Sequence, residues 1–216
     1  MTRLKWNFAI ALVFVVLNLV LIPIAIAVDH DSVKFYLSLG LCILISFLLP
    51  VVQLILKKNW PVLLEVIICT QAYLGLSISS AFNMYDYWYN WDMVLHGAMG
   101  VEALIFGYYL LLLFGGRNLP FYAKAVFLII FVFGIAAIWE MMEFIAGKIM
   151  NEDYQKVFDP REPDGVNDTM MDIIIAFVTA SATILVFAID NIFKGRLLKI
   201  VDKSLIDEKI EEKENV

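Results

Sequence analysis

Residues 91–114 read WDMVLHGAMGVEALIFGYYLLLLF, an apolar run interrupted by only three acidic or basic side chains, Asp92, His96 and Glu102. At a helical rise of 1.5 Å per residue, about 20 residues cross a hydrocarbon core ~30 Å thick. The run therefore predicts a transmembrane helix. An ionised side chain at the centre of such a helix costs at least ~2.5–3.5 kcal/mol, so its ionisable residues are functional candidates.

Five further runs of similar length lie on either side of this stretch. The chain has 216 residues, of which 62% are hydrophobic and 18% charged, and its mean hydropathy is +0.81. A soluble domain of this length cannot bury so much apolar surface. The sequence therefore predicts an all-α, polytopic transmembrane bundle that forms a single domain over residues 1–193. The six spans are expected near residues 6–28, 33–56, 60–82, 91–114, 121–147 and 169–193.

Lys and Arg are distributed unevenly between the two sets of loops, which predicts the orientation of the chain because positive residues stay preferentially in the cytoplasm. Of 16 Lys and Arg residues, one set of loops holds only Lys34, Lys148, Lys156 and Arg161. Both termini are therefore expected in the cytoplasm, and the acidic loop 148–168 outside. Residues 194–216 are expected to form a cytoplasmic amphipathic tail at the membrane surface, or alternatively a solvated charged tail.

Composition also limits the binding partners. The net charge of -6 and the pI near 4.9 argue against nucleic acid, because phosphate binding needs a basic face. Membrane lipid is the expected partner, and the oligomeric state stays open. Cys42 and Cys69 both lie within apolar runs, and we interpret them as packing residues. The first span ends in Ala25-Ile26-Ala27, which resembles a signal-peptide cleavage site, but its length favours an uncleaved helix.

The last three spans each carry a pair of ionisable residues at helical spacing. The pairs are Asp92 with His96, Glu140 with Glu143, and Asp168 with Asp172. All six residues are expected within one slab roughly 10 Å thick at the outer end of the bundle, by the helical rise. Consecutive helices with short connections pack as neighbours, so a single acidic cluster around one imidazole is expected. The alternative is that these residues lie at helix ends in headgroup water, with Asp168 as an N-cap.

Like charges confined to one slab repel, so the cluster needs a cation or shared protons. A histidine among carboxylates favours Zn or Mn over Mg or Ca, although Mg or Ca stays possible. We therefore expect a divalent-metal site, with Glu143 or Asp168 as the catalytic base toward a bound water. The expected metal ligands are Asp92, His96, Glu140 and Asp172.

Three residues near this end of the bundle are candidates for substrate contacts. Arg161 carries the only guanidinium near the outer slab and could hold a phosphate, or pair with neighbouring acids. Trp88 and Trp91 belong to an aromatic cluster beside Asp92. Such a cluster is typical of an interfacial belt, with a headgroup or sugar platform as the alternative.

Three spaced motifs also carry a family resemblance. They are Asp-x-x-x-His-x-x-x-Gly ending at Gly100, an aromatic residue followed by Glu-x-x-Glu from Trp139, and Asp-Thr-x-x-Asp from Asp168. Over roughly residues 85–190 they resemble the YjdF family of bacterial inner-membrane proteins and, more loosely, the VanZ-like family. Ala176 and Thr179 depart from the expected Asn and Gly. The resemblance implies a location in the bacterial inner membrane and a set of candidate residues, but no reaction.

The sequence thus favours a metal-dependent membrane hydrolase or transferase that acts on a lipid or cell-envelope precursor. The alternatives are a proton- or cation-coupled transporter and a non-catalytic envelope scaffold. A transporter of this kind typically contains inverted repeats and broken helices. Neither feature is apparent from the sequence.

Overall fold

The computed structural model describes residues 3–27, 33–57, 60–151, 153–156, 165–193 and 195–205. Their secondary structure is helical, and the described ranges contain no strand. Six helical segments are long and apolar enough to cross a membrane, namely Arg3–Ala27, Val33–Leu56, Val62–Phe82, Trp91–Leu113, Phe121–Ile149 and Gly165–Ile192. The prediction of an all-α protein with six spans is confirmed. The cytoplasmic location of both termini stays a prediction.

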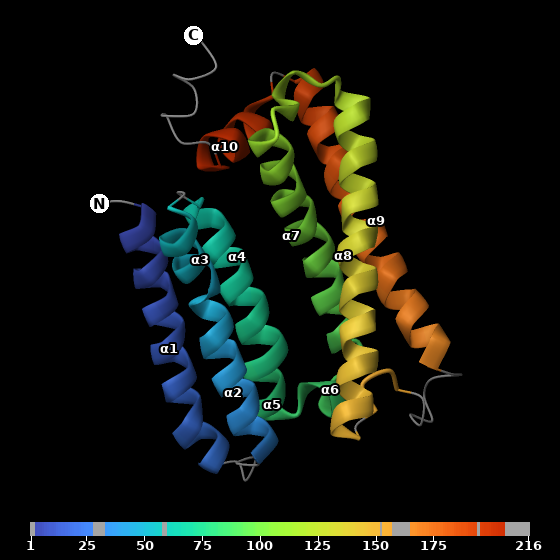
Figure 1. The fold of residues 1–216 in the computed structure, drawn as a ribbon. Coiled ribbons are helices and arrows are strands. Elements are labelled where there is room, and N and C mark those ends of the chain that lie inside the picture. The colour runs from blue at the N-terminus through green and yellow to red at the C-terminus, as the bar shows by residue number, and fades with distance from the viewer. Residues whose placement is uncertain are drawn as a thin grey trace. The chain divides into compact units, whose positions relative to one another are not determined.

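The chain divides into two compact units, Met1–Trp91 with Phe193–Val216, and Asp92–Ile192. In the first unit, α1 (Arg3–Ala27) packs against α2 (Val33–Ser46) and α4 (Val62–Ala72), as Figure 1 shows. Its shorter helices are α3 (Leu48–Leu56), α5 (Ser79–Phe82) and α6 (Met84–Tyr87). Polar side chains link these helices inside the unit. The Nδ2 of Asn7 donates to Oε1 of Gln53 at 3.0 Å, and the Ser77 hydroxyl donates to Asn18.

Two of the six spans are not continuous α-helices, although no broken helix is apparent from the sequence. The second is interrupted at Phe47, between α2 and α3. Pro50 has no N–H, so it cannot donate to the carbonyl of Ser46 one turn earlier. The Sγ of Cys69 lies 3.9 Å from that carbonyl oxygen. The third span contains a π-helical segment, η1 (Tyr73–Ile78), between α4 and α5.

Both cysteines are buried and free, as expected for packing residues. Each also takes part in a polar contact that packing alone does not explain. The Cys69 thiol donates to Oε1 of the buried Glu65 at 3.3 Å, one turn away on α4. The Nδ2 of Asn18 lies 3.4 Å from Sγ of Cys42. The cysteines therefore help to satisfy polar groups inside the first unit.

Helix α10 (Arg196–Leu205) also belongs to the first unit, where it contacts α4. Leu205 is fully buried, and its carbonyl accepts a hydrogen bond from Nη1 of Arg3 at 3.4 Å. The exposed residues of this helix are Arg196, Leu197, Lys199, Ile200 and Lys203. Residues Arg196–Leu205 of the predicted tail are thus helical. Residue 194 and residues 206–216 lie outside the described ranges, and the placement of α10 at the cytoplasmic membrane surface stays a prediction.

The second unit consists of three long helices. They are α7 (Trp91–Leu113), α8 (Phe121–Met150) and α9 (Gly165–Ile192), with the short η2 (Gly116–Asn118) between α7 and α8. Gly115 ends α7 at φ 79°, a left-handed conformation that favours glycine. Large apolar side chains of α8, such as Ile130, Met141 and Phe144, remain exposed within the chain, as expected for a helix that faces lipid.

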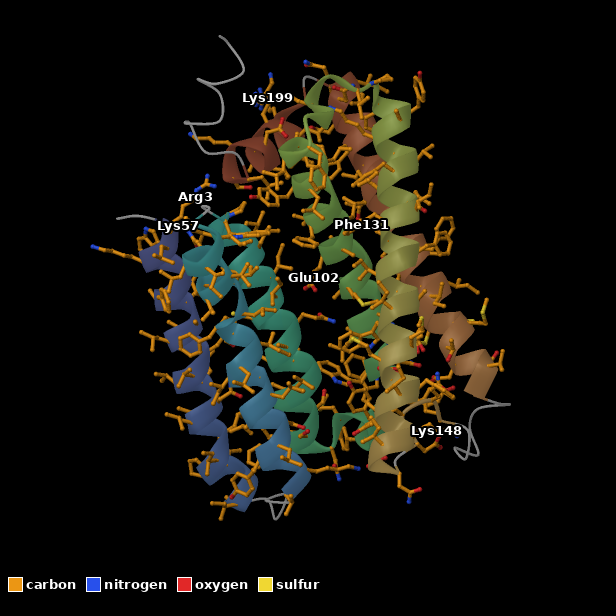
Figure 2. The ribbon with its side chains drawn as sticks, in the orientation of Figure 1. Arg3, Lys57, Glu102, Phe131, Lys148 and Lys199 are labelled. Atoms are coloured by element: carbon orange, nitrogen blue, oxygen red, sulfur yellow. The ribbon has the colours of Figure 1, made fainter. Side chains whose placement is uncertain are left out.

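Aromatic side chains and a glycine hold these three helices together. Phe131 of α8, labelled in Figure 2, lies 6.0 Å from the Phe106 ring of α7, between ring centroids. The rings of Phe133 and Phe177 stack at 5.0 Å between α8 and α9. Gly100 of α7 lies directly against the backbone of α9. A Cβ at Gly100 would overlap the Ala176 carbonyl oxygen and would lie 2.8 Å from the Ala176 Cα.

The contact at Gly100 predicts the effect of adding one methyl group. Gly100→Ala is expected to lower the unfolding free energy by about 1–3 kcal/mol, because the backbone of α9 must move to admit the Cβ. The measurement is the thermal unfolding midpoint of the purified protein in detergent.

Gly97→Ala provides a matched control on the same helix. Its Cβ would lie 3.5 Å from Cγ2 of Thr179, an ordinary van der Waals distance. Because alanine also favours the helix by up to about 1 kcal/mol over glycine, this variant should unfold at or above the wild-type midpoint. Equal midpoints for the two variants would contradict the close approach of α7 and α9.

Candidate functional site

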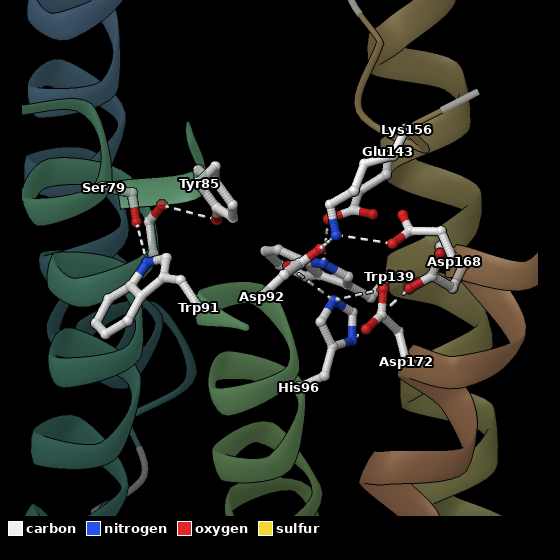
Figure 3. Close-up of polar contacts among 12 residues, drawn as sticks. Ser79, Tyr85, Trp91, Asp92, His96, Trp139, Glu143, Lys156, Asp168 and Asp172 are labelled. Atoms are coloured by element: carbon white, nitrogen blue, oxygen red, sulfur yellow. Dashed lines mark hydrogen bonds and ion pairs between the residues drawn. The ribbon is translucent and has the colours of Figure 1, made fainter. Parts of the chain in front are cut away.

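The second unit brings the six ionisable residues of the three motifs into one cluster (Figure 3). His96 lies at its centre. Its Nε2 is 3.5 Å from Oδ1 of Asp92 on the same helix and 3.7 Å from Oδ2 of Asp172 on α9. Its Nδ1 is 3.7 Å from Oε1 of Glu140 on α8. The imidazole therefore has a carboxylate beside each of its two ring nitrogens.

Helical periodicity produces this arrangement. Asp92 and His96 are four residues apart and share one face of α7, as do Asp168 and Asp172 on α9. Glu140 and Glu143 are three residues apart on α8. Trp139 of α8 holds the Glu143 carboxylate in position, since its Nε1 donates to Oε1 of Glu143 at 2.8 Å. Each helix therefore contributes a pair of side chains with a fixed direction.

The cluster is deeply buried for such a concentration of acids. His96 is 3% exposed and Asp172 is 1% exposed, and Asp92, Glu140 and Asp168 are also buried. Glu143 is half-buried. Carboxylates in headgroup water would be mostly exposed, so this burial argues against the interpretation that the six residues merely lie at wet helix ends. Asp168 is also not an N-cap, because α9 already begins at Gly165 and Asp168 lies within its first turn.

Lys156, from the segment between α8 and α9, provides a cation at the edge of the cluster. Its Nζ donates to Oδ2 of Asp92 and to Oδ1 of Asp168, both at 2.7 Å. Burial alone lowers the pKa of Lys156, but the carboxylates of Asp92 and Asp168 outweigh it and hold the pKa above its usual range. The ammonium therefore remains charged at neutral pH.

The backbone conformation at Lys156 and a hydrogen bond of its neighbour indicate that this segment is held in place. Its φ is 49°, in the left-handed region, which costs a non-glycine residue about 1–3 kcal/mol unless surrounding contacts compensate. The neighbouring Gln155 donates from Nε2 to Oγ1 of Thr169 at 3.2 Å, which ties the same segment to α9. Two consecutive side chains of this loop thus reach the first turns of α9.

Lys156 is not among the residues expected from the sequence, where it counts only as one charge of an outer loop. Pairing it with Asp92 requires contact across 64 positions, and no local spacing indicates that contact. The signal that points toward it is indirect. A cluster of acids in one slab requires a compensating cation, and the connection between α8 and α9 is the nearest source of one.

Two groups of side chains in the cluster have the geometry to hold a metal ion. One consists of Asp92, His96 and Asp172, and the other of His96, Glu140 and Glu143; within each, the potential ligand atoms lie within 4.8 Å of one another. Several buried atoms of these groups also lack a hydrogen-bond partner among the described residues. They include Nδ1 of His96, Oε2 of Glu143 and Oδ2 of Asp172. Buried polar atoms of this kind normally have a partner.

The remaining predicted residues lie elsewhere. Trp91, the first residue of α7, is the one residue of this helix that belongs to the first unit, where its indole Nε1 donates to Oγ of Ser79 at 2.7 Å (Figure 3). Trp88 of the same unit is 44% exposed, and its ring centroid lies 5.6 Å from that of Trp91. Arg161 lies outside the described residues. The role of these three residues in substrate binding stays a prediction.

The two ion pairs of Lys156 predict its contribution to stability. Lys156→Met is expected to lower the unfolding free energy by on the order of 3 kcal/mol, because it leaves Asp92 and Asp168 without their cation in a buried site. The unfolding midpoint of the purified protein measures this effect.

Lys148→Met is the matched control, since Lys148 is an exposed cation in the last turn of α8. It should lower the midpoint far less than Lys156→Met, because it removes only an exposed charge and its contact with the Phe144 ring at 5.4 Å. In Asp168→Asn, one of the two ion pairs of Lys156 is already lost. Adding Lys156→Met to this variant should therefore lower the unfolding free energy by less than it does in the wild type. Fully additive effects of the two substitutions would contradict a direct interaction.

Comparison with known proteins gives a family for this chain. A family model described as predicted membrane protein (DUF2238) matches residues 9–191, which include residues from both units and the whole cluster. No curated protein and no solved structure matches the chain. Together with the six apolar helices, the family match identifies a multi-pass membrane protein. The chain belongs to the DUF2238 family of predicted membrane proteins.

Proposed function

We propose that the cluster around His96 binds a divalent metal ion and that the protein uses this ion to act on a lipid or cell-envelope precursor. The observation that carries the proposal is the burial of His96 among carboxylates, together with its Nδ1 and the Oε2 of Glu143, which lack a hydrogen-bond partner within the described residues. Oxygen and imidazole ligands at these separations are the ones that divalent cations use in proteins.

The composition of the cluster supports a choice of metal. Carboxylates alone suit Mg or Ca, whereas a buried imidazole favours Zn or Mn. His96 and at least two of the carboxylates beside it would bind the ion. A carboxylate that stays free of the ion would then be available as a general base. When bound, such an ion lowers the pKa of a coordinated water toward ~7 and polarises an acyl or phosphoryl oxygen.

The substrate class follows from the location of the cluster. Its residues lie on helices that are long and apolar enough to cross a membrane, so the molecules that reach them most readily are membrane-embedded. The resemblance to the YjdF family and the looser one to VanZ-like proteins support a bacterial inner-membrane location and an envelope-related role. On this proposal, the protein is a hydrolase or transferase of the cell envelope.

Metal analysis tests the first step. Protein purified in detergent without chelator should contain about one Zn or Mn per chain, and His96→Ala should lose it. Added Zn²⁺ or Mn²⁺ should raise the unfolding midpoint and a chelator should lower it. At a free metal concentration 100 times Kd, the gain in unfolding free energy is about 2.7 kcal/mol.

Glu102→Gln is the control, because Glu102 is a half-buried carboxylate on the same helix that belongs to neither ligand group. It should retain the metal. Absence of stoichiometric metal from the wild type, combined with a midpoint that neither metal nor chelator changes, would contradict the proposal. That result would favour shared protons in the cluster.

A further inference from the structure

The two ring nitrogens of His96 have different surroundings. Nε2 lies beside Asp92 and Asp172, at 3.5 and 3.7 Å. Nδ1 lies 3.7 Å from Oε1 of Glu140, and the described residues offer it no hydrogen-bond partner. Because a neutral imidazole carries one N–H and one lone pair, its two nitrogens cannot play the same role.

Positive charge is present on only one side of this ring within the described part of the chain. Lys156 donates to Asp92, whose other oxygen faces Nε2. On the Nδ1 side, Glu140 and Glu143 have no Lys or Arg partner among the described residues. The hydrogen bond from Trp139 to Glu143 comes from a neutral indole. The carboxylates beside Nδ1 thus have the greater need for a cation.

Metal-binding histidines usually have the asymmetry that this cluster shows. One nitrogen binds the ion, and the other donates its N–H to a carboxylate that fixes the tautomer and the ring orientation. Asp92, at 3.5 Å, is in position to accept from Nε2, and Asp172 places a second negative charge 3.7 Å from the same nitrogen, which leaves the lone pair on Nδ1. Two ligands that each lie about 2.1 Å from an ion are roughly 3–4 Å apart, a range that includes the 3.7 Å between Nδ1 and Oε1 of Glu140.

We infer that the divalent cation binds on the Nδ1 side of His96, to His96, Glu140 and Glu143, while Asp92 and Asp172 position the imidazole through Nε2. Lys156 compensates the charge of Asp92, to which its Nζ donates at 2.7 Å. This inference rests on the proposed metal site. It changes the ligand set expected from the sequence, in which Asp92 and Asp172 bind the ion and Glu143 acts as a base.

The matched pair Glu143→Gln and Asp172→Asn tests this assignment. Each variant removes one negative charge next to His96 and keeps the side-chain shape. We measure Zn²⁺ affinity by competition with a chromophoric chelator, on purified full-length protein in detergent. Asp172→Asn should weaken binding by about 10–100-fold, as expected for a positioning partner, and Glu143→Gln at least about tenfold further.

A second variant tests the identity of the nitrogen itself. Replacement of His96 by Nδ1-methylhistidine blocks that nitrogen and leaves Nε2 available, so it should abolish Zn²⁺ binding. The unfolding midpoint of the metal-free protein shows whether this variant folds; if it does not, the Glu143 and Asp172 pair decides alone.

Two different results would overturn the inference. A larger loss of affinity in Asp172→Asn than in Glu143→Gln, or Zn²⁺ retained by the folded Nδ1-methylhistidine variant, would place the ion on the Nε2 side and leave the proposed metal site intact. A wild-type protein that binds no Zn²⁺ or Mn²⁺ would instead overturn both proposals.

Discussion

Charge repulsion inside a buried site is the constraint on which the second unit depends. Two carboxylates about 4 Å apart repel by roughly 4 kcal/mol at an effective dielectric constant of about 20. The cluster contains five carboxylates, from Asp92, Glu140, Glu143, Asp168 and Asp172. Against them, the described residues place one ammonium and one imidazole. Even with His96 protonated, two positive charges cannot neutralise five acids, so further protons or a bound cation must complete the balance.

The packing of α7, α8 and α9 keeps these groups at short distances despite their repulsion. Gly100 allows the backbones of α7 and α9 to approach closely one turn from His96. Stacked and tilted aromatic pairs hold α8 against both neighbours. The loop that carries Lys156 then connects Asp92 of α7 to Asp168 of α9. The apolar contacts of the helices therefore supply the stability that a concentration of like charges removes.

Much of this arrangement could be predicted from the sequence because it follows from helix geometry. Six apolar runs predict six spans, and spacings of three and four residues place each ionisable pair on one helix face. The depth of the pairs, counted from the helix ends, predicts that they meet. Contacts that depend on tertiary structure could not be predicted in this way. The pairing of Lys156 with Asp92 links distant positions, and the indole of Trp91 donates to Ser79 because of packing inside the first unit.

On the proposed assignment, the imidazole of His96 binds a divalent cation together with carboxylate oxygens. X-ray absorption spectroscopy of the Zn²⁺-loaded protein in detergent tests this claim most directly, because it reports the atoms around the metal. We expect a shell of oxygen and nitrogen ligands at about 2.0–2.2 Å, with the outer-shell scattering of one imidazole. His96→Ala should not retain the ion, and Zn²⁺ added to it in excess should show no such scattering. A loaded metal whose spectrum shows no imidazole, or a spectrum that His96→Ala leaves unchanged, would contradict it.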